Sequence, residues 1–510
     1  MTAASAVVRT AADFAAWAAS HARGVTYAGP DPHYGIGLEG VLPGYGIVCF
    51  DDTPAATVLR GAGVAVFCPG AEEPIPTDVA APGREDADAL LAPGAAPDRD
   101  PSSEPRGTPA LMARADVRRW LAARAAGLDG PLPLLVFKPS HRLEALSAAA
   151  GWRLLAAPAA LARRFENKAA FRALADELGL AQPPGRIVGR ADMRYDALAA
   201  ALGPRLVVQA PYGYAGMQSH VVADDDALAA ALAGSRSPTW RVAALVDGLP
   251  LSVNACATTR GVAVGAPFLQ LTGLPAVTPY PLGSCGQDWS VMGALDVDVD
   301  GVAHVARRLG AAMAAAGFRG VFGVDVVQAR DGQLLAIEVN PRLIASIALY
   351  TQLELADGRL PLLARHLLAH LDPDADQAPL DAGAGPLAGG QVVAHHVGGA
   401  PFRAAQGVAA GFWRVPSAPP PPRPAIRPAV RIDGVGADEV LVLPPAPGRD
   451  VAFGQAYARL QFAGRGPARP DGALDAGVDA LLRRVAEVVG VAGGASAVRD
   501  TGRAGRRTGR

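Results

Sequence analysis

The segment GVDVVQARDGQLLAIEVNPR, residues 323–342, determines how we interpret this chain. Two apolar, β-rich runs flank Asp331-Gly332, and an Asp-Gly pair between such runs is a strong signal for a β-hairpin with a two-residue turn. In a hairpin centred on that pair, Asp325 lies directly opposite Glu338. A three-residue turn would break this register, so the predicted pairing of the two acids depends on the turn.

The two facing acids predict a metal site. Opposed side chains in an antiparallel pair have Cβ atoms roughly 4.5–5.5 Å apart, and like charges at that distance are destabilising. Either the carboxylates splay into water on a solvated face, or a cation lies between them. Asn340 points to the same face as Glu338 and adds an amide oxygen. Carboxylate and amide oxygens suit Mg²⁺ or Mn²⁺ rather than zinc.

The composition disfavours several classes of protein. A chain of 510 residues is too long for one ordinary core, so we expect several domains. The formal net charge of −1 provides no field that would attract nucleic acid or an anionic membrane. The four cysteines lack CxxC or CxxH spacing, which argues against a zinc site or a disulfide framework. With an amphipathic N-terminus and no apolar run of membrane-spanning length, the expected location is the cytoplasm, without nucleic-acid or membrane partners.

The order of apolar runs predicts a mixed α/β and α+β architecture. Strand–helix–strand alternation occurs twice in the first third of the chain, a long helix follows it, and the hairpin lies in a strand-rich region after that. The C-terminal part has short β runs and one closing helix. The predicted parts are an N-terminal α/β domain (1–159) with a mobile Pro- and Gly-rich insertion at about 70–110, a central domain (160–375), a C-terminal β-rich domain (376–495) and a disordered basic tail (496–510).

Lysine is rare in this chain, because only Lys138 and Lys168 are lysines among 47 basic residues. A lysine retained in such a chain indicates a position that needs a compact point charge, although two cases can also arise by chance. Lys168, in FENKAAF, is either a phosphate contact or an exposed helix lysine. Lys138 ends an apolar strand, where it is either a second functional charge or a surface lysine.

Two further segments are compatible with a nucleotide. The loop in LVVQAPYGYAGMQSHVV contains Gly213 and Gly216, which would let backbone N–H groups approach a phosphate, although most such loops are simple turns. The segment WRVAALVDGLPLSVNA has an apolar strand, a turn at Asp247-Gly248 and a second strand. An apolar backbone segment of this kind can receive an adenine ring.

Taken in their order along the chain, four segments resemble the ATP-grasp superfamily, which includes biotin carboxylase and D-alanine–D-alanine ligase. The segments are FENKAAFRALADELGLAQPP, LVVQAPYGYAG, FRGVFGVDVV and LLAIEVNPRLIAS. The most specific element is an acid followed thirteen residues later by Glu-x-Asn-x-Arg. The resemblance covers about residues 160–370 and implies an ATP-grasp fold with a preceding α/β domain and a C-terminal β-rich cap.

The resemblance implies ATP and Mg²⁺ (or Mn²⁺) as cofactors and assigns a role to each matching residue. Asp325, Glu338 and Asn340 would hold the metal ions that bridge the ATP phosphates. Glu338 and Arg342 would be the catalytic residues, with Arg342 stabilising the phosphorylated intermediate. Residues 211–219 would form a flap over the triphosphate. The nucleotide contacts would be Lys168, Gln209, Gly213, Gly216, Ala244, Leu245, Val246 and Asp247.

Two positions depart from the family pattern. Many relatives have a second ATP-contacting lysine where this chain has Gln209, whose amide carries no charge. The hinge of relatives often carries acids, whereas this chain has Ala243 and Ala244 there. A contact to the ribose is therefore unassigned, with Asp247 as a weak substitute.

The superfamily resemblance implies that ATP activates a carboxylate as an acyl phosphate, which an amine then attacks to give an amide or peptide bond, ADP and phosphate. Phosphoryl transfer mainly requires positioning and charge neutralisation, so it needs no Ser, Cys or His nucleophile. The candidate substrate contacts are Arg342, Gln270 and Asp288, although an acid in a loop is more often simply solvated. The expected partners are a small carboxylate and an amine, such as an amino acid or peptide, and a second copy of the chain in a homodimer.

Two alternatives remain open from the sequence. One is a biotin-carboxylase-like enzyme that activates bicarbonate, although neither lysine follows a methionine as in a biotinylation site. The other is a non-catalytic ATP-binding regulatory protein, which Gln209 and the hinge alanines favour modestly. The intact set of Asp325, Glu338, Asn340 and Arg342 argues against the second alternative, because a non-enzyme has little need for paired acids.

Overall fold

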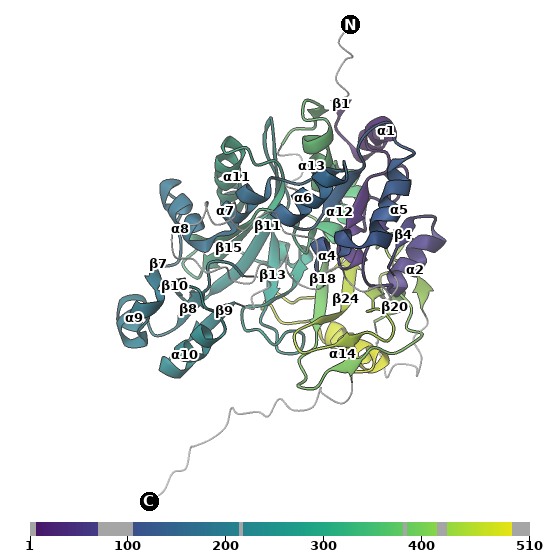
Figure 1. Cartoon of the computed structure of the whole chain (residues 1–510). Coiled ribbons are helices and arrows are strands. Elements are labelled where there is room, and N and C mark those ends of the chain that lie inside the picture. The colour runs from purple at the N-terminus through teal and green to yellow at the C-terminus, as the bar shows by residue number, and fades with distance from the viewer. Residues whose placement is uncertain (1–6, 70–105, 214–217, 381–384, 416–425, 492–510) are drawn as a thin grey trace, which may run out of the picture.

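The structure of the chain is a computed structural model that describes residues 7–69, 106–213, 218–380, 385–415 and 426–491 (Figure 1). The described strands form three larger sheets, of five, four and eleven strands, and two two-stranded sheets. None of the described helices combines the length and the apolar character that a membrane crossing requires. Gly216, most of the predicted insertion and the predicted basic tail lie outside the described residues.

The N-terminal part is a parallel five-stranded sheet with the strand order β4-β3-β2-β5-β6, packed between helices. Both predicted strand–helix–strand alternations are confirmed, as β3-α2-β4 and β5-α6-β6. The strands are β2 (Thr26–Ala28), β3 (Gly46–Val48), β4 (Ala65–Phe67), β5 (Pro133–Val136) and β6 (Arg153–Leu155). The helices are α1 (Ala11–His21), η1 (Pro32–Gly35), α2 (Pro54–Gly61), α4 (Thr108–Ala113), α5 (Ala115–Ala125) and α6 (His141–Ala149).

The predicted insertion ends earlier than the composition indicated. Helix α4 begins at Thr108, and its residues are buried in the N-terminal part. Leu111 and Met112 pack in the same core as Val117 and Leu134. The end of the predicted insertion therefore belongs to the folded N-terminal part, because TPALMA supplies apolar side chains that this core buries.

The predicted long helix is two helices, α7 (Ala159–Glu166) and α8 (Lys168–Glu177). Asn167 divides them with an extended backbone (φ −67°, ψ 120°). Its side-chain oxygen accepts from the N–H groups of Ala169 and Ala170 at 3.0 and 3.1 Å, which is the N-cap role that asparagine favours. The break gives the neighbouring Glu166 and Lys168 different surroundings, and both contribute to the site described below.

A small antiparallel sheet with the order β7-β10-β8-β9 forms a lobe at the left of Figure 1, together with α9 and α10. Trp240, Val208 and Leu228 belong to the core between this sheet and its helices. Side chains alternate between the two faces of a strand, so Arg241 and Gln209 lie on the opposite face. The elements are β7 (Gly185–Gly189), η3 (Arg190–Asp192), α9 (Tyr195–Leu202), β8 (Leu206–Gln209), β9 (Ser219–Val222), α10 (Asp225–Ala233) and β10 (Thr239–Ala244).

The eleven-stranded sheet runs through the middle of the molecule in the order β16-β15-β11-β13-β14-β18-β24-β22-β20-β21, with β12 paired to β11. Pairing of β14 with β18 continues this sheet across the predicted boundary between residues 375 and 376. Its strands are β11 (Gly248–Thr258), β12 (Gly261–Val264), β13 (Phe268–Thr272), β14 (Ser284–Asp288), β15 (Gly320–Ala329), β16 (Leu334–Asn340), β18 (Gly389–His395), β20 (Gly411–Arg414), β21 (Arg427–Pro428), β22 (Glu439–Leu443) and β24 (Ala456–Ala463).

The remaining elements cover the large sheet or close its edges. The short pairs are β1 with β17 and β19 with β23. The helix α14 is the predicted closing helix. The bounds are β1 (Val7–Val8), η4 (Ser290–Ala294), α11 (Val299–Ala315), α12 (Ile347–Ala356), α13 (Leu362–Leu371), β17 (Asp376–Gln377), β19 (Phe402–Arg403), β23 (Asp450–Val451) and α14 (Ala476–Val489).

The two faces of β11 differ in polarity. Leu251, Val253 and Ala255 alternate onto the face that packs against α11. Ser252 and Asn254 lie on the other face, and both are buried. Polar residues on the inner face of a buried strand are costly unless they are hydrogen-bonded, so this face is a natural place for a functional site.

Candidate functional site

The hairpin of β15 and β16 pairs Asp325 with Glu338, as the sequence predicts. The predicted two-residue turn is wrong, however. The N–H of Ala329 donates to the carbonyl of Gln333 at 2.9 Å, so three residues form the loop, and Gly332 adopts φ +85°. Three-residue hairpin loops commonly place a glycine in this left-handed conformation.

A β-bulge restores the register that the three-residue loop shifts. Val326 pairs with Ala336, but Asp325 pairs with Glu338, so Ile337 is one extra residue on β16. Ala336 packs in the core beneath α11. Without the bulge, the two-residue period of a strand would direct Glu338 into the same core; the extra residue turns Glu338 to the face that carries Asp325.

The Asp325 carboxyl is in an unfavourable place for a charge. Burial and the neighbouring Glu338 carboxylate together raise the pKa of Asp325 from 3.8 to about 7, although hydrogen bonds from Ser252 and Asn340 act in the opposite direction. The Nδ2 of Asn340 donates to Asp325 Oδ2 at 3.0 Å. A positive charge placed beside the two acids would relieve this repulsion.

Glu338 is held in its charged form by cations. Burial disfavours its charge, but Lys168, Arg241 and Arg342 outweigh burial and lower its pKa. The nearest is Lys168, whose Nζ lies 3.0 Å from Glu338 Oε2 and which is itself buried. The Lys168 N–H donates to the Pro211 carbonyl at 3.0 Å, which joins α8 to the predicted glycine loop.

The glycine loop approaches the same lysine. A Cβ atom placed on Gly213 would lie 3.8 Å from Lys168 Nζ, so the backbone there passes close to the ammonium group. The structure thus brings together Lys168, Gly213 and the hairpin acids, which lie far apart in the sequence. Gly216 lies outside the described residues, and its predicted phosphate contact remains a prediction.

Asn340 connects the metal candidates to Arg342. In the observed orientation its Nδ2 faces Asp325, and its Oδ1 accepts from Nη2 of Arg342 at 3.0 Å. The carboxylates of Asp325 and Glu338 fit Mg²⁺, because both supply hard oxygen ligands and a metal ion between them would relieve their repulsion. Metal binding by the Asn340 oxygen would require its side-chain amide to turn over, so this part of the predicted ligand set remains a prediction.

Arg342 is fixed from several sides. Its guanidinium lies 5.2 Å from the centre of the Phe137 ring, and its Nε lies 3.8 Å from Glu166 Oε1. Glu166 also binds Lys138, whose Nζ lies 2.8 Å from Glu166 Oε2. Lys138 is therefore engaged in an ion pair and is not simply an exposed strand-end lysine. The ion cluster of Lys138, Glu166 and Arg342 links the N-terminal part to the hairpin.

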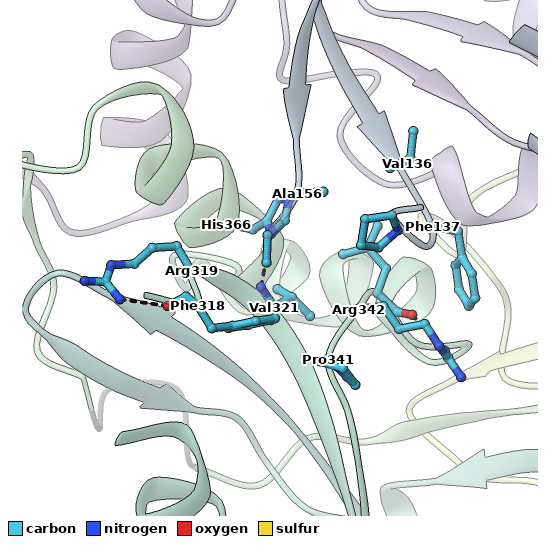
Figure 2. A pocket seen from close by; sticks show the side chains of 12 residues that line it. Val136, Phe137, Ala156, Phe318, Arg319, Val321, Pro341, Arg342 and His366 are labelled. Carbon is cyan, nitrogen blue, oxygen red and sulfur yellow. Dashed lines mark hydrogen bonds between the residues drawn. The ribbon is translucent and has the colours of Figure 1, made fainter. Parts of the chain in front are cut away.

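Figure 2 shows the position of Arg342 at the junction between the N-terminal part and the hairpin. A cavity of about 10 Å³ lies between the end of β5 and the start of β15, and residues 341–343 form one of its walls. The side chains of Phe137 and Arg342 extend to the same side, away from His366. The ring of His366 accepts the N–H of Val321 at 3.0 Å, so it is part of the framework and not of the site.

The predicted adenine segment, Ala244–Val246, together with Asp247, connects the small lobe to the large sheet. The N–H groups of Ala244 and Leu245 donate to the carbonyls of Pro184 and Arg205, each at 2.8 Å. The N–H of Val246 has no acceptor among the described residues. Asp247 is exposed and pairs with Arg205 at 3.5 Å, so its predicted ribose contact has no further support.

Asp288 has surroundings that support a structural role in place of the predicted substrate contact. It is fully buried at the end of β14, and burial raises its pKa. Its two oxygens accept from the N–H groups of Val291 at 3.0 Å and Ala468 at 2.8 Å. A Cβ atom on Gly466 would collide with this carboxylate at 2.0 Å, so the chain closes tightly around it.

Gln270 belongs to a row of glutamines that the sequence does not reveal. It pairs with Gln287, Gln287 with Gln391, and Gln391 with Gln461, on four adjacent strands. Nε2 of Gln461 donates to Gln391 at 3.1 Å, and Nε2 of Gln391 donates to Gln287 at 2.5 Å. Such a row becomes visible only when the strand order β13-β14-β18-β24 is known.

The glutamine row lies on the same face of the sheet as the hairpin acids. Asp325 pairs with Ser252, and Ser252 pairs with Phe268, two residues before Gln270 on the same strand. Because alternate residues share a face, Gln270 projects to the side that carries Asp325. Polar side chains therefore extend from the predicted metal site across this face of the sheet.

Solved structures share this arrangement of sheets. The biotin carboxylase domain of 2-oxoglutarate carboxylase from Hydrogenobacter thermophilus, a dimer complexed with MgADP, ADP and bicarbonate, aligns with a TM-score of 0.53 at 9% identity, over 87% of this chain and 86% of that one. Biotin carboxylase from Campylobacter jejuni aligns with a TM-score of 0.52 at 12% identity, over 86% and 87%. The chain has the ATP-grasp fold.

A third structure supports the same ATP-grasp fold. The N5-carboxyaminoimidazole synthase from Aspergillus clavatus, complexed with ADP and 5-aminoimidazole ribonucleotide, aligns with a TM-score of 0.50 at 14% identity, over 92% of this chain and 98% of that one. No protein-family model and no curated protein matches the sequence. The predicted fold is therefore confirmed, and the roles of individual residues remain predictions.

Proposed function

We propose that this protein is an ATP-dependent carboxylate–amine ligase. It would activate a carboxylate as an acyl phosphate and join it to an amine, with release of ADP and phosphate. The observation that carries this proposal is the meeting of Asp325 and Glu338 beside Lys168, within an ATP-grasp fold. Paired acids next to a buried lysine suit a site where cations and phosphates alternate.

The residues of the chain have separate tasks in this reaction. Asp325 and Glu338 would hold Mg²⁺, which would supply positive charge to neutralise the phosphate groups. Lys168, released from Glu338, would contact the phosphates from beneath the glycine loop. The free N–H of Val246 would donate to the adenine ring.

Arg342 would bind the substrate carboxylate and stabilise the charge that develops on the acyl phosphate. A planar guanidinium suits both tasks, because it can donate two parallel hydrogen bonds to one anion. Glu166 and Phe137 restrict the position of this guanidinium, which lowers the cost of ordering it during the reaction. The glutamine row ending at Gln270 would provide neutral hydrogen-bonding groups to the rest of the substrate.

The test is ADP and phosphate release by purified protein with Mg²⁺-ATP and a panel of carboxylates and amines. The panel contains amino acids, small peptides and bicarbonate, because bicarbonate is named in the complex of one similar structure. Glu338→Gln should abolish turnover and leave the fold intact, as judged by circular dichroism. AMP in place of ADP among the products would exclude the acyl-phosphate route.

The competing functions give different results in the same assay. Turnover with bicarbonate in place of an organic acid would support a carboxylase-type reaction. Binding of Mg²⁺-ATP without turnover across the panel would support a regulatory protein. The proposal further includes action on small molecules in the cytoplasm as a homodimer, since one similar structure is a dimer; light scattering in solution tests the oligomeric state.

A further inference from the structure

Arg241 is a buried cation of the small lobe that the predicted site does not include. It lies on β10, only 2% of its surface is exposed, and its side chain projects from the sheet face opposite α9 and α10. Nη1 donates to the carbonyl of Ile337 at 2.6 Å and to Oε1 of Gln209 at 3.4 Å. Arg241 therefore reaches from the small lobe to the bulge of the hairpin that carries Glu338.

The guanidinium of Arg241 feels the charge of Glu338, but no carboxylate of the described residues lies within ion-pair distance of it. None of the ion pairs in the described part of the chain includes it, and its Nε is buried without a hydrogen-bond partner. Burial lowers its pKa to about 10, so it remains charged at neutral pH. A buried charge is costly unless an opposite charge and further hydrogen bonds offset the cost, which points to an anion that binds at this place.

Arg241 stands next to the position where a positive charge is missing. It pairs with Gln209 across β10 and β8, so the two side chains share one face. Gln209 donates to the Ser219 hydroxyl at 2.9 Å and accepts from Arg241, so its amide is fixed between these two side chains on neighbouring strands. The positive charge on this face of the small sheet is thus on Arg241 of β10, the strand next to the one that holds Gln209.

We propose that Arg241 is a nucleotide phosphate-binding residue and supplies the charge that Gln209 lacks. This inference rests on the proposed function, because it requires that Mg²⁺-ATP binds between the small lobe and the hairpin. The ligand is the polyphosphate of a nucleoside di- or triphosphate, and the adenine and ribose make no contact with Arg241. A guanidinium offers a fixed fork of donors that matches phosphate oxygens, and Nε is one of these donors.

Nucleotide binding to Arg241→Met tests the inference without knowledge of the other substrates. Isothermal titration calorimetry compares ATP, ADP, AMP and adenosine, each with Mg²⁺. Since a hydrogen bond to a charged group contributes roughly 1.5–3 kcal/mol, ATP and ADP should bind about tenfold to a hundredfold more weakly, while adenosine affinity stays unchanged. Adding Gln209→Lys to Arg241→Met should restore most of the lost affinity, because a lysine at 209 returns the charge to the same face of the small sheet.

The matched control is Arg190→Met in the same lobe. Arg190 also donates to backbone carbonyls, those of Ser235 and Leu232, but it is exposed and both of these contacts lie within the small lobe. This variant should bind all four nucleotides as the wild type does. If Arg241→Met does not fold, Gln209→Lys alone remains informative, because a second charge on this face should tighten ATP and ADP several-fold and leave adenosine unchanged.

Two outcomes would overturn the inference. If Arg241→Met weakens adenosine as much as ATP, then Arg241 only supports the fold of the lobe. If it changes no affinity, then the phosphates bind elsewhere. A wild-type protein that binds no nucleotide at all would instead remove the proposed function itself, so the two failures are distinguishable.

Discussion

Replacing Asp325 with asparagine removes one of two facing carboxylates with almost no change in shape, and we expect the metal-free protein to become more stable at pH 8. The oxygen of an asparagine can still accept from Asn340, and its Nδ2 can donate to Glu338. The substitution therefore removes the like-charge repulsion without leaving a buried group unpaired. It should also abolish stabilisation by Mg²⁺-ATP, because one predicted metal ligand is lost.

The size and sign of the effect follow from the pKa of Asp325, which the fold raises from 3.8 to about 7. Each pKa unit is worth ~1.4 kcal/mol, so ionising this carboxyl in the folded protein costs at most about 4 kcal/mol. Below pH 4 both the folded and unfolded forms are protonated, and the cost vanishes. It grows as the pH rises towards 7, because only the unfolded chain ionises freely there, and it is constant at higher pH.

Urea unfolding in EDTA at pH 5 and pH 8 measures this difference. Asp325→Asn should gain about 2–4 kcal/mol over the wild type at pH 8 and clearly less at pH 5. With Mg²⁺-ATP the order should reverse, because the wild type alone gains binding energy. Asp331→Asn, in the exposed turn of the same hairpin, is the control and should change neither comparison. A variant that is less stable than the wild type by the same amount at both pH values would refute the electrostatic argument.

Three further substitutions test separate contacts. Burial raises the pKa of Glu354 to about 8, so this carboxyl should contribute a fall in stability of up to ~1.4 kcal/mol per pH unit between pH 4.5 and 8, in addition to that of Asp325; Glu354→Gln should remove this contribution in pH-dependent unfolding. Lys138→Met and Glu166→Gln should be non-additive by about 1 kcal/mol in a double-mutant cycle of unfolding, because Glu166 binds both Lys138 and Arg342; additive effects would exclude the cluster. Asp288→Asn should lose about 1–3 kcal/mol of stability, because its amide nitrogen would face a backbone N–H, and nucleotide affinity measured by calorimetry should not change.

The sequence predicts those parts of the site that depend on short-range patterns. The alternation in VFGVDVV and LLAIEV places Asp325 and Glu338 on facing strands, as the structure confirms. The helix break before Lys168 was not predicted. The Asn167 cap could have been recognised from its residue type, because asparagine favours this position. The prediction of one long helix missed this signal.

Contacts between distant segments were not predictable in the same way. Asp288 accepts from Ala468, which lies 180 residues further along the chain, so no local pattern distinguishes it from a solvated loop acid. The glutamine row needs the order of four strands, of which β14 and β18 are neighbours only in the folded sheet. Part of the hairpin was also not predictable: the predicted pairing of the acids is right, but the predicted turn is wrong. Two one-residue shifts cancel, and neither has a signal that a single sequence reveals.

The bulge at Ile337 also explains why Arg241 belongs to this site. An extra residue in a strand leaves a backbone group outside the ladder, and that group needs a partner when it is buried. The Ile337 carbonyl obtains its partner from Arg241 of the small lobe, at 2.6 Å. Moving the lobe away would orphan the carbonyl, at a cost of about 1–3 kcal/mol, and would withdraw a positive charge from Glu338. The residue that turns Glu338 towards the predicted metal site therefore also accepts a hydrogen bond from Arg241, so that one contact joins the predicted metal ligand to the proposed phosphate-binding cation.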